Sequence, residues 1–300
     1  MKQKSKQALA VLCVLASGCL WGSMGVFVRH LNAAGLSAMQ IVEIRSIITA
    51  VLTLAGTALI RPQLLRIRLR DLWCFAGTGL CSVLFFNFCY FRAMEYMSLS
   101  AAAVLLYTAP VFVMLLSALL FREKLSWRKA GACALAVGGC VLVSGVAGGQ
   151  TDWSVAGLLL GLGAGFGYAL YSIFSRFAIN RGYTAVTITV YTFLFAALGG
   201  IPLTDFGPVA QTLRTDGAAA VGFWLLYAVL TTVLPYLLYT YGLHGVENSA
   251  ASVIASIEPV VATLLGLMFF AEWPTPAAVA GMGLVLAAVC LLSLHRRGRT

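Results

Sequence analysis

Charged residues are scarce in this sequence. Only 10% of its 300 residues are Asp, Glu, Lys or Arg, whereas a soluble domain of this length carries about 25%. Acidic residues are the scarcer sign, with 10 Asp and Glu against 20 Lys and Arg. Long polar linkers and low-complexity segments are also missing between the apolar runs. These absences exclude an ordinary soluble domain and leave no segment that would form a separate one.

Motifs for metal binding and for catalysis are missing as well. The sequence has eight cysteines but no Cys-x-x-Cys pair, and its three histidines (His30, His244 and His295) are scattered. A metal site needs several such ligands to converge. Neither His-Glu-x-x-His nor Gly-x-Ser-x-Gly occurs, and no acidic pair lies in an apolar run. We therefore expect no metal, no other cofactor and no enzymatic activity.

What the sequence does contain is long apolar runs. Hydrophobic residues make up 61% of the chain, and the mean hydropathy is +0.93. A bilayer core about 30 Å thick requires roughly 20 apolar residues per helical span. The sequence thus predicts an all-α membrane protein with ten transmembrane helices, near 8–28, 38–60, 72–92, 99–121, 129–147, 154–174, 185–203, 219–243, 249–271 and 276–294.

Basic residues fall mostly on one side of these spans. With the N-terminus inside, only Arg29, Arg92 and Arg214 lie in outer segments, and Arg45 lies within a span. Lys and Arg are retained on the cytoplasmic side of a membrane. The bias predicts a multi-pass protein of the cell membrane with both termini in the cytoplasm. The net charge of +10 is then a topology signal, and we expect the lipid bilayer rather than nucleic acid as a partner.

The two halves of the chain repeat one another. An offset of 149 residues places Tyr90 on Tyr239, Pro110 on Pro259, Glu123 on Glu272 and Ser100 on Ser249, and an offset of 147 places Trp21 on Tyr168 and Arg29 on Arg176. Each half has five predicted spans, so the second must insert upside down relative to the first. We predict two inverted five-helix repeats, residues 1–148 and 149–300, with a site between them near the bilayer midplane.

These motifs resemble those of EamA-type transporters in the drug/metabolite transporter superfamily. The resemblance rests on Ser100-Ala101-Ala102-Ala103 through Pro110 to Glu123, its recurrence from Ser249 through Glu258-Pro259 to Glu272, the segment around Arg45, and Trp21-Gly22. It covers nearly the whole chain, although the second repeat lacks an Arg facing Arg45. It implies a transporter of small molecules such as metabolites, amino acids or drugs, without identifying the substrate.

Pro110 and Pro259 lie near the centres of predicted spans four and nine. Proline frees a helix carbonyl, which must be satisfied by protein or by water in a cavity. Glu258 lies about 14 Å deep, at 1.5 Å per residue, and an acid there is costly and usually faces an interior cavity. The matching breaks indicate a transport site or packing kinks, and Glu258 either carries a coupling proton or bonds a neighbouring helix.

Arg45 lies about 10 Å deep in span two, within vertical reach of Glu258. It is interpreted as a substrate anchor or as a structural residue that forms an ion pair or snorkels to the membrane surface. The other candidates offer flat apolar surface or a hydroxyl or amide suited to a metabolite pocket, although some belong to interfacial belts in the alternative interpretation. They are Trp21, Asn87, Tyr90, Tyr107, Tyr168, Tyr171, Tyr236, Tyr239, Ser252 and Ser256.

The sequence therefore favours a secondary transporter that moves a small solute across the cell membrane by alternating access. Because the chain has no ATP-binding loop, we expect an exporter driven by an ion or solute gradient. A channel or a receptor-like membrane protein is the alternative, and a homodimer is left open.

Overall fold

The computed structural model describes residues 2–145 and 154–294, and these form helices joined by short connections. The predicted boundary at residue 148 lies outside the described residues. The first half contains α1 (Lys2–Gly22), α2 (Met24–Ala33), α3 (Ala38–Ile60), α4 (Leu72–Ala76), α5 (Phe85–Ala93), α6 (Leu99–Leu106), α7 (Ala109–Phe121) and α8 (Trp127–Val143). The second half contains α9 (Val155–Asn180), α10 (Ala185–Gly200), α11 (Gly207–Ala228), α12 (Leu234–Gly242), α13 (Asn248–Ala255), α14 (Glu258–Phe270) and α15 (Pro276–Leu294).

Nine helical stretches within the described ranges are long and apolar enough to cross a membrane. The helix α8, at 17 residues, lies at the lower end of the length that a span needs, about 17–25 residues. It runs beside α15, where the backbones approach so closely that a Cβ on Gly139 would meet the Gly281 carbonyl. The prediction of an all-α membrane protein is confirmed, and its count of ten spans holds approximately, with α8 as the shortest.

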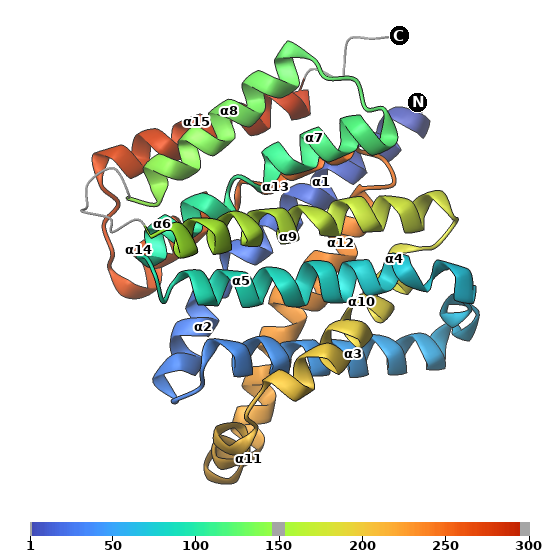
Figure 1. Ribbon diagram of the computed structural model, residues 1–300, viewed down its shortest axis with the longest axis vertical. Helices are drawn as coiled ribbons and strands as arrows, with labels where there is room; N and C mark the ends of the chain where they lie inside the picture. Colours follow the sequence, from blue (N-terminus) through green and yellow to red (C-terminus); the bar gives the residue numbers. More distant parts are fainter. Residues whose placement is uncertain (1, 146–153, 295–300) are drawn as a thin grey trace.

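The helices run from one face of the molecule to the other (Figure 1). The start of α1 and the end of α15 lie at the same face, which we call the terminal face. The α7–α8 connection and the end of α9 lie there too, whereas the start of α6 and the end of α14 lie at the opposite, far face.

Four of the membrane-crossing stretches depart from a regular α-helix. One stretch divides into α6 and α7 just before Pro110, and another divides into α13 and α14 just before Pro259. The segments Gly77–Leu84 and Val229–Val233 are π-helical, and the second coincides with the end of the first after the 149-residue offset. Such π-helical turns are rare and occur often at functional sites. The repeat is therefore visible in the irregularities of the fold.

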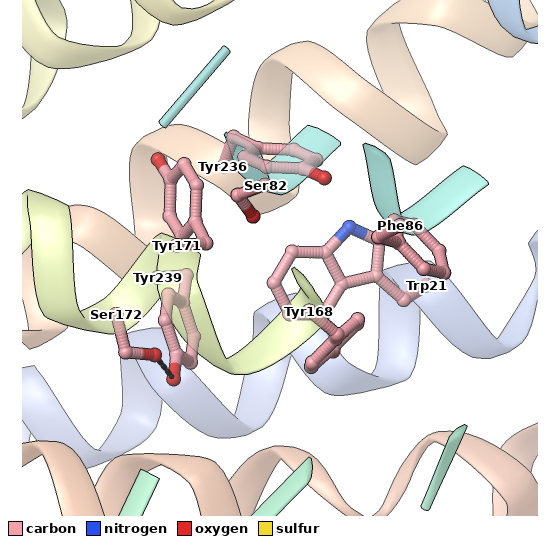
Figure 2. A pocket seen from close by; sticks show the side chains of 8 residues that line it. All are labelled: Trp21, Ser82, Phe86, Tyr168, Tyr171, Ser172, Tyr236 and Tyr239. Atoms are coloured by element: carbon pink, nitrogen blue, oxygen red, sulfur yellow. Dashed lines mark hydrogen bonds between the residues drawn. The ribbon is translucent and has the colours of Figure 1, made fainter. Parts of the chain in front are cut away.

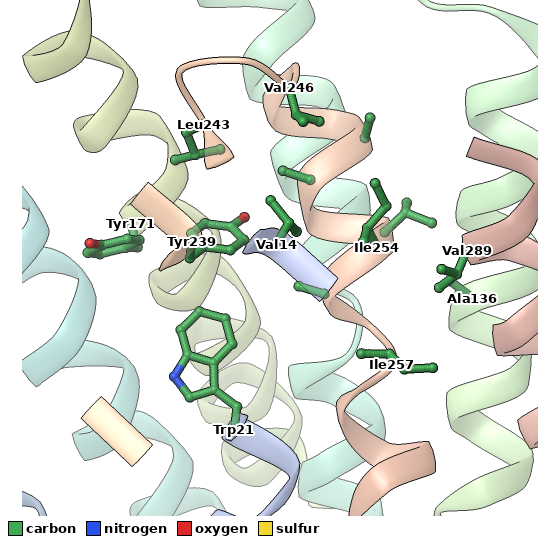
Figure 3. Packing of buried hydrophobic residues seen from close by; sticks show 14 of the residues in the cluster. Val14, Trp21, Ala136, Tyr171, Tyr239, Leu243, Val246, Ile254, Ile257 and Val289 are labelled. Carbon is green, nitrogen blue, oxygen red and sulfur yellow. The ribbon is translucent and has the colours of Figure 1, made fainter. Parts of the chain in front are cut away.

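The main apolar core surrounds α1 (Figure 3). Val14 and Trp21 of α1 meet Tyr239 of α12 and Ile254 of α13, while Val289 of α15 lies on the outer side. Apolar burial drives helix association little in lipid, so close packing must hold these helices together. Because α1 belongs to one half and α12 and α13 to the other, this core joins the halves.

One predicted span begins too late. We expected span eight to begin at residue 219, but α11 already begins at Gly207 and includes Arg214, which we had expected in a loop. Gly217 has φ 53° and ψ −123° within this stretch. Glycine adopts such a conformation without the Cβ clash that other residues meet, so two helical pieces join at a bend.

Candidate functional site

Five of the predicted aromatic residues form one group, which we call the aromatic cluster: Trp21, Tyr168, Tyr171, Tyr236 and Tyr239 (Figure 2). Their rings meet mostly edge to face, with centroids 5.3 Å apart for Trp21 and Tyr236 and 4.9 Å apart for Tyr171 and Tyr236. The cavity that they enclose has a volume of about 10 Å³, roughly the space for a single water. The aromatic cluster is packed shut, so a solute would require its rings to separate.

Hydroxyl contacts hold the cluster in place. The Tyr171 hydroxyl lies 2.6 Å from the Thr240 hydroxyl, and the Ser172 hydroxyl lies 2.8 Å from the Tyr239 hydroxyl (Figure 2). Such pairing satisfies polar groups that would be costly to bury alone. Sequence reasoning missed three further lining residues, Ser82, Phe86 and Ser172.

A second cavity lies where the two helix breaks face each other. It is lined by Leu106, Tyr107, Ala109, Pro110, Tyr168, Ser252, Ala255, Ser256 and Glu258. Glu258 is the first residue of α14, where the positive end of the helix dipole favours a carboxylate. Among the described residues, no hydrogen bond or ion pair is recorded for its carboxylate. Pro110 and Glu258 thus share one cavity, and Tyr168 also belongs to the aromatic cluster.

A third cavity, which we call the far-face cavity, has a volume of about 180 Å³. Its lining includes Leu99 and Ser100 at the start of α6, Ser144 after α8, and Pro259 of α14. Tyr107 lines both this cavity and the one beside Glu258. Tyr107 therefore links the far-face cavity to the cavity beside Glu258, and Tyr168 links that cavity to the aromatic cluster.

Three predicted residues line none of these cavities. The buried Arg45 donates from Nη2 to Asn87 Oδ1 at 3.3 Å, and its Nη1 lies 3.2 Å from Met24 Sδ. Its Nε has no hydrogen-bond partner within the described ranges. Asn87 in turn donates to the Val83 carbonyl at 2.6 Å. Tyr90 packs against Phe86, which lines the cavity of the aromatic cluster.

At the terminal face, polar side chains hold the start of α13; we call them the terminal-face network (Glu123, Lys129, Arg176, Asn248 and Ser249). The Glu123 carboxylate accepts from the Asn248 amide at 2.9 Å, the Ser249 amide at 3.4 Å and the Ser249 hydroxyl at 2.6 Å. Lys129 Nζ lies 3.8 Å from it. A carboxylate at a helix N-terminus satisfies free N–H groups and the helix dipole together.

Arg176 of α9 completes the terminal-face network. It donates from Nε to Asn248 Oδ1 at 2.9 Å and from Nη2 to the Val246 carbonyl at 2.6 Å. The Glu123 side chain is only 10% exposed, and Asn248 and Ser249 are buried. This face of the molecule is therefore closed between α9, α13 and the α7–α8 connection.

The equivalent residues at the far face are arranged differently. Arg29 and Glu272 form a bidentate pair, at 2.6 Å and 3.0 Å, which we call the far-face pair. Its two side chains are 51% and 53% exposed. The start of α6 is capped instead by the Ser98 hydroxyl, which accepts from the Ala101 amide at 3.2 Å. Within the described residues, no hydrogen bond joins Glu272 to α6, and the far-face cavity lies beside the start of that helix.

The backbone presents both glutamates in the same way. The residue before each one is left-handed, Arg122 with φ 54° and Ala271 with φ 55°. The amide of the following glutamate donates to the carbonyl six positions back, at 3.2 Å for Glu123 and 3.3 Å for Glu272. Each helix therefore ends at a residue in the left-handed conformation, a position that glycine usually occupies. The two glutamates thus differ in their partners and not in the turns that carry them.

Helices long enough to cross a membrane and breaks that recur in both halves are features of transporters built from repeats. The comparisons agree: the EamA-like transporter family matches residues 8–145 and 155–294. The chain belongs to that family.

Several relatives align over nearly the whole chain. An uncharacterized transporter of Archaeoglobus fulgidus is 27% identical over 97% of this chain and 99% of its own length. A probable terminal-alkyne amino-acid exporter of Streptantibioticus cattleyicolor is 22% identical over 98% of this chain and 96% of its own. One crystal structure superposes with a TM-score of 0.76 at 18% identity, covering 97% of this chain and 99% of that one, which shows a shared fold.

Proposed function

We propose that this protein is a secondary transporter that works by alternating access between two inverted repeats, residues 1–148 and 149–300. The observation that carries the proposal is the difference between two equivalent helix starts. Asn248 at the start of α13 is 0% exposed, whereas its counterpart Leu99 at the start of α6 is 61% exposed. One sequence pattern thus exists here in a closed and an open arrangement. Inverted repeats that exchange such arrangements would open the site to each side in turn.

The exchange can be written residue by residue. In the opposite state, Glu272 leaves Arg29 and caps α6 at Ser100, as Glu123 caps α13 at Ser249. Arg29 then donates to the carbonyl of Met97, the counterpart of Val246. Meanwhile Glu123 releases α13 and the terminal face opens. Each face has a glutamate that can cap a helix start and an arginine that can bind a carbonyl before it, so the two states can be close in free energy, as a transport cycle requires.

The substrate that the cavities favour is a small amphiphilic solute such as an amino acid. Aromatic rings of the cluster offer apolar area, and Glu258 offers a carboxylate for a cationic group or a proton. The relative named as an amino-acid exporter supports this class. In our proposal Glu258 exchanges a proton when the site alternates, so export is driven by a proton gradient. Trp21, Tyr107, Tyr168, Ser252 and Ser256 line the path, while Arg45 and Asn87 position α3 against α5.

The membrane in this proposal is the cell membrane, with both termini in the cytoplasm. The terminal face carries most of the basic residues, as the retention of Lys and Arg predicts. The far face is then the outside, and the structure represents an outward-open state.

A counterflow experiment separates this carrier from the alternative channel. A thermal-shift screen of amino acids first selects the solute that most stabilises the purified protein. Proteoliposomes loaded with the unlabelled solute should then transiently accumulate the labelled solute above its external concentration. A channel would only equilibrate the label, and that result would refute alternating access.

The variant Glu258→Gln tests the coupling group in the same vesicles. We expect it to keep counterflow but to lose accumulation driven by a pH gradient, because an amide cannot release a proton. Accumulation at the parent level would show that Glu258 is not the coupling group.

A further inference from the structure

A fourth cavity lies at the terminal face, away from the aromatic cluster and Glu258. Its volume is about 260 Å³, and its walls are the α3–α4 connection, the α9–α10 connection and the start of α10. The lining residues are Gln63, Leu64, Arg66, Arg68, Arg181, Gly182, Tyr183, Thr184 and Thr187. Three arginines and no acidic residue therefore border it.

Hydrogen bonds fix the connection that carries two of these arginines. The Thr187 hydroxyl donates to the Leu64 carbonyl at 2.8 Å, and the Tyr191 hydroxyl donates to the Leu65 carbonyl at 2.6 Å. Further along, the Arg68 amide donates to the Tyr183 hydroxyl at 3.0 Å. These bonds fasten the backbone on both sides of Arg66 to α10 and to the α9–α10 connection. The basic side chains thus project from a built scaffold.

The charge of the cavity is unbalanced. Asp71 is the nearby acid, and it is occupied by Arg181 Nε at 3.0 Å and by the Tyr183 hydroxyl at 2.7 Å. Arg181 also stacks over Trp73 at 4.8 Å, which holds its guanidinium in place. For the exposed side chains of Arg66 and Arg68, no acceptor is recorded within the described residues. Two forked donors therefore remain available to a ligand.

The start of α10 adds to this positive field. Its N-cap Thr184 accepts from the Thr187 amide at 3.3 Å, and the earlier N–H groups of the first turn have no helical partner. Such a helix N-terminus attracts anions. Apolar side chains flank the basic connection on both sides, with Leu59 85%, Ile60 79% and Leu69 81% exposed. In a bilayer these side chains face acyl chains, so the cavity opens at headgroup level.

We propose that this cavity binds a phosphate group, supplied by the headgroup of an anionic membrane phospholipid. Forked guanidinium groups suit phosphate oxygens, and basic pockets between helices at the cytoplasmic leaflet bind such headgroups. Because residues of the α3–α4 connection and of the α9–α10 connection both line the cavity, a bound lipid would tie the first half of the chain to the second. This site is separate from the transport path and stands whether or not alternating access does.

The test uses the full-length protein in neutral detergent, titrated with dioleoyl-phosphatidylglycerol, with dioleoyl-phosphatidylcholine and with inorganic phosphate. Thermal unfolding and native mass spectrometry report binding. The variant R66Q/R68Q should weaken phosphatidylglycerol binding by roughly 30-fold, since each interfacial basic residue contributes about fivefold in affinity. The matched control R61Q/R70Q removes equal charge from the same connection but no residue that lines the cavity, so it should lose much less.

A lysine pair, R66K/R68K, keeps the topology charges if the glutamine pair does not fold. It should still bind severalfold more weakly, because an ammonium lacks the forked geometry. The proposal would be overturned if R66Q/R68Q and R61Q/R70Q lost equal affinity for phosphatidylglycerol, or if R66K/R68K bound it as the parent does. It would also be overturned if the parent showed no preference for phosphatidylglycerol over phosphatidylcholine. Equal stabilisation by inorganic phosphate would overturn the lipid as the source.

Discussion

At the terminal face Glu123 caps α13, whereas at the far face Glu272 pairs with Arg29 and leaves α6 to Ser98. The contacts of Glu123 are nearly buried and join three parts of the fold. Charge-assisted hydrogen bonds of this kind are shorter and stronger than neutral ones. The contact of Glu272 is about half exposed, and exposed ion pairs are screened by solvent. Equivalent residues thus form a strong closure at one face and a weak surface pair at the other.

In the proposed cycle, this difference places the protein in one of two states. The far-face cavity lies on the side where the glutamate is disengaged, and the start of α13 is buried where Glu123 caps it. Removing one closure should therefore move the protein toward the opposite state, and removing the other should not. The predictions below test that asymmetry, beginning with the largest expected effect.

The variant Glu123→Gln should open the terminal face. Hydrogen bonds to a charged group contribute about 1.5–3 kcal/mol, so the terminal-open population should rise by at least about tenfold. The readout is the reaction rate of a thiol reagent with the cysteine introduced by Ser252→Cys, at a position that is buried in this state. All eight native cysteines are first replaced, because Cys81 and Cys290 are exposed. An unchanged rate would mean that Glu123 does not hold this face closed.

The serines at the two helix starts should act in opposite directions. Ser249→Ala removes one of the hydrogen bonds to the Glu123 carboxylate, at the lower end of about 1.5–3 kcal/mol, and should speed labelling of the introduced thiol by roughly tenfold. Ser100→Ala removes a hydroxyl that is used only in the proposed opposite state. In the Glu123→Gln background it should therefore slow labelling by a similar factor, because it removes a bond that would stabilise the terminal-open state. Effects in the same direction would contradict the exchange of closures.

The sequence predicted features of the site wherever a single residue type strongly affects the helix backbone or is costly to bury. Two prolines pointed to the stretches that divide, and the depth of Glu258 pointed to a polar cavity. The repeat pattern paired Glu123 with Glu272, but a repeat specifies both closures equally. In the proposed alternating-access cycle, which of them is engaged depends on the state of the whole molecule, and no local sequence pattern encodes it.

The aromatic cluster shows a second limit. Asn87 was expected to line the pocket because its amide suits one, yet Asn87 binds Arg45 and the Val83 carbonyl. The π-helical segment just before it inserts extra backbone into a turn, which rotates the residues that follow. Ser82 and Phe86 line the cavity instead. No residue type in this segment indicates a π-helix, so the sequence could not predict which side chains of this stretch face the cavity.

The smallest effect is expected for Glu272→Gln. Hydrogen bonding from Arg29 lowers the pKa of Glu272 below its ordinary value. A carboxylate with a lowered native pKa stabilises the fold at pH values above its unfolded pKa, and this contribution is lost as pH falls through the native pKa. The stability difference between parent and variant should therefore be slight at neutral pH, shrink with added salt and vanish on acidification.

Glu95→Gln is the matched control for this variant. Glu95 forms a similarly exposed pair with Arg92 at 2.6 Å on the same face, within three residues of sequence. Both variants should change thermal stability equally little, since each breaks one exposed pair. They should differ in transport, because only Glu272 is required to cap α6 in the opposite state. The structure already favours the far-open arrangement, so losing that cap hardly changes the resting population but slows the step that closes the far face. If the two variants transport at the same rate, Glu272 has no role beyond its surface ion pair. The likeness of the two faces would then be limited to the left-handed turns before Glu123 and Glu272.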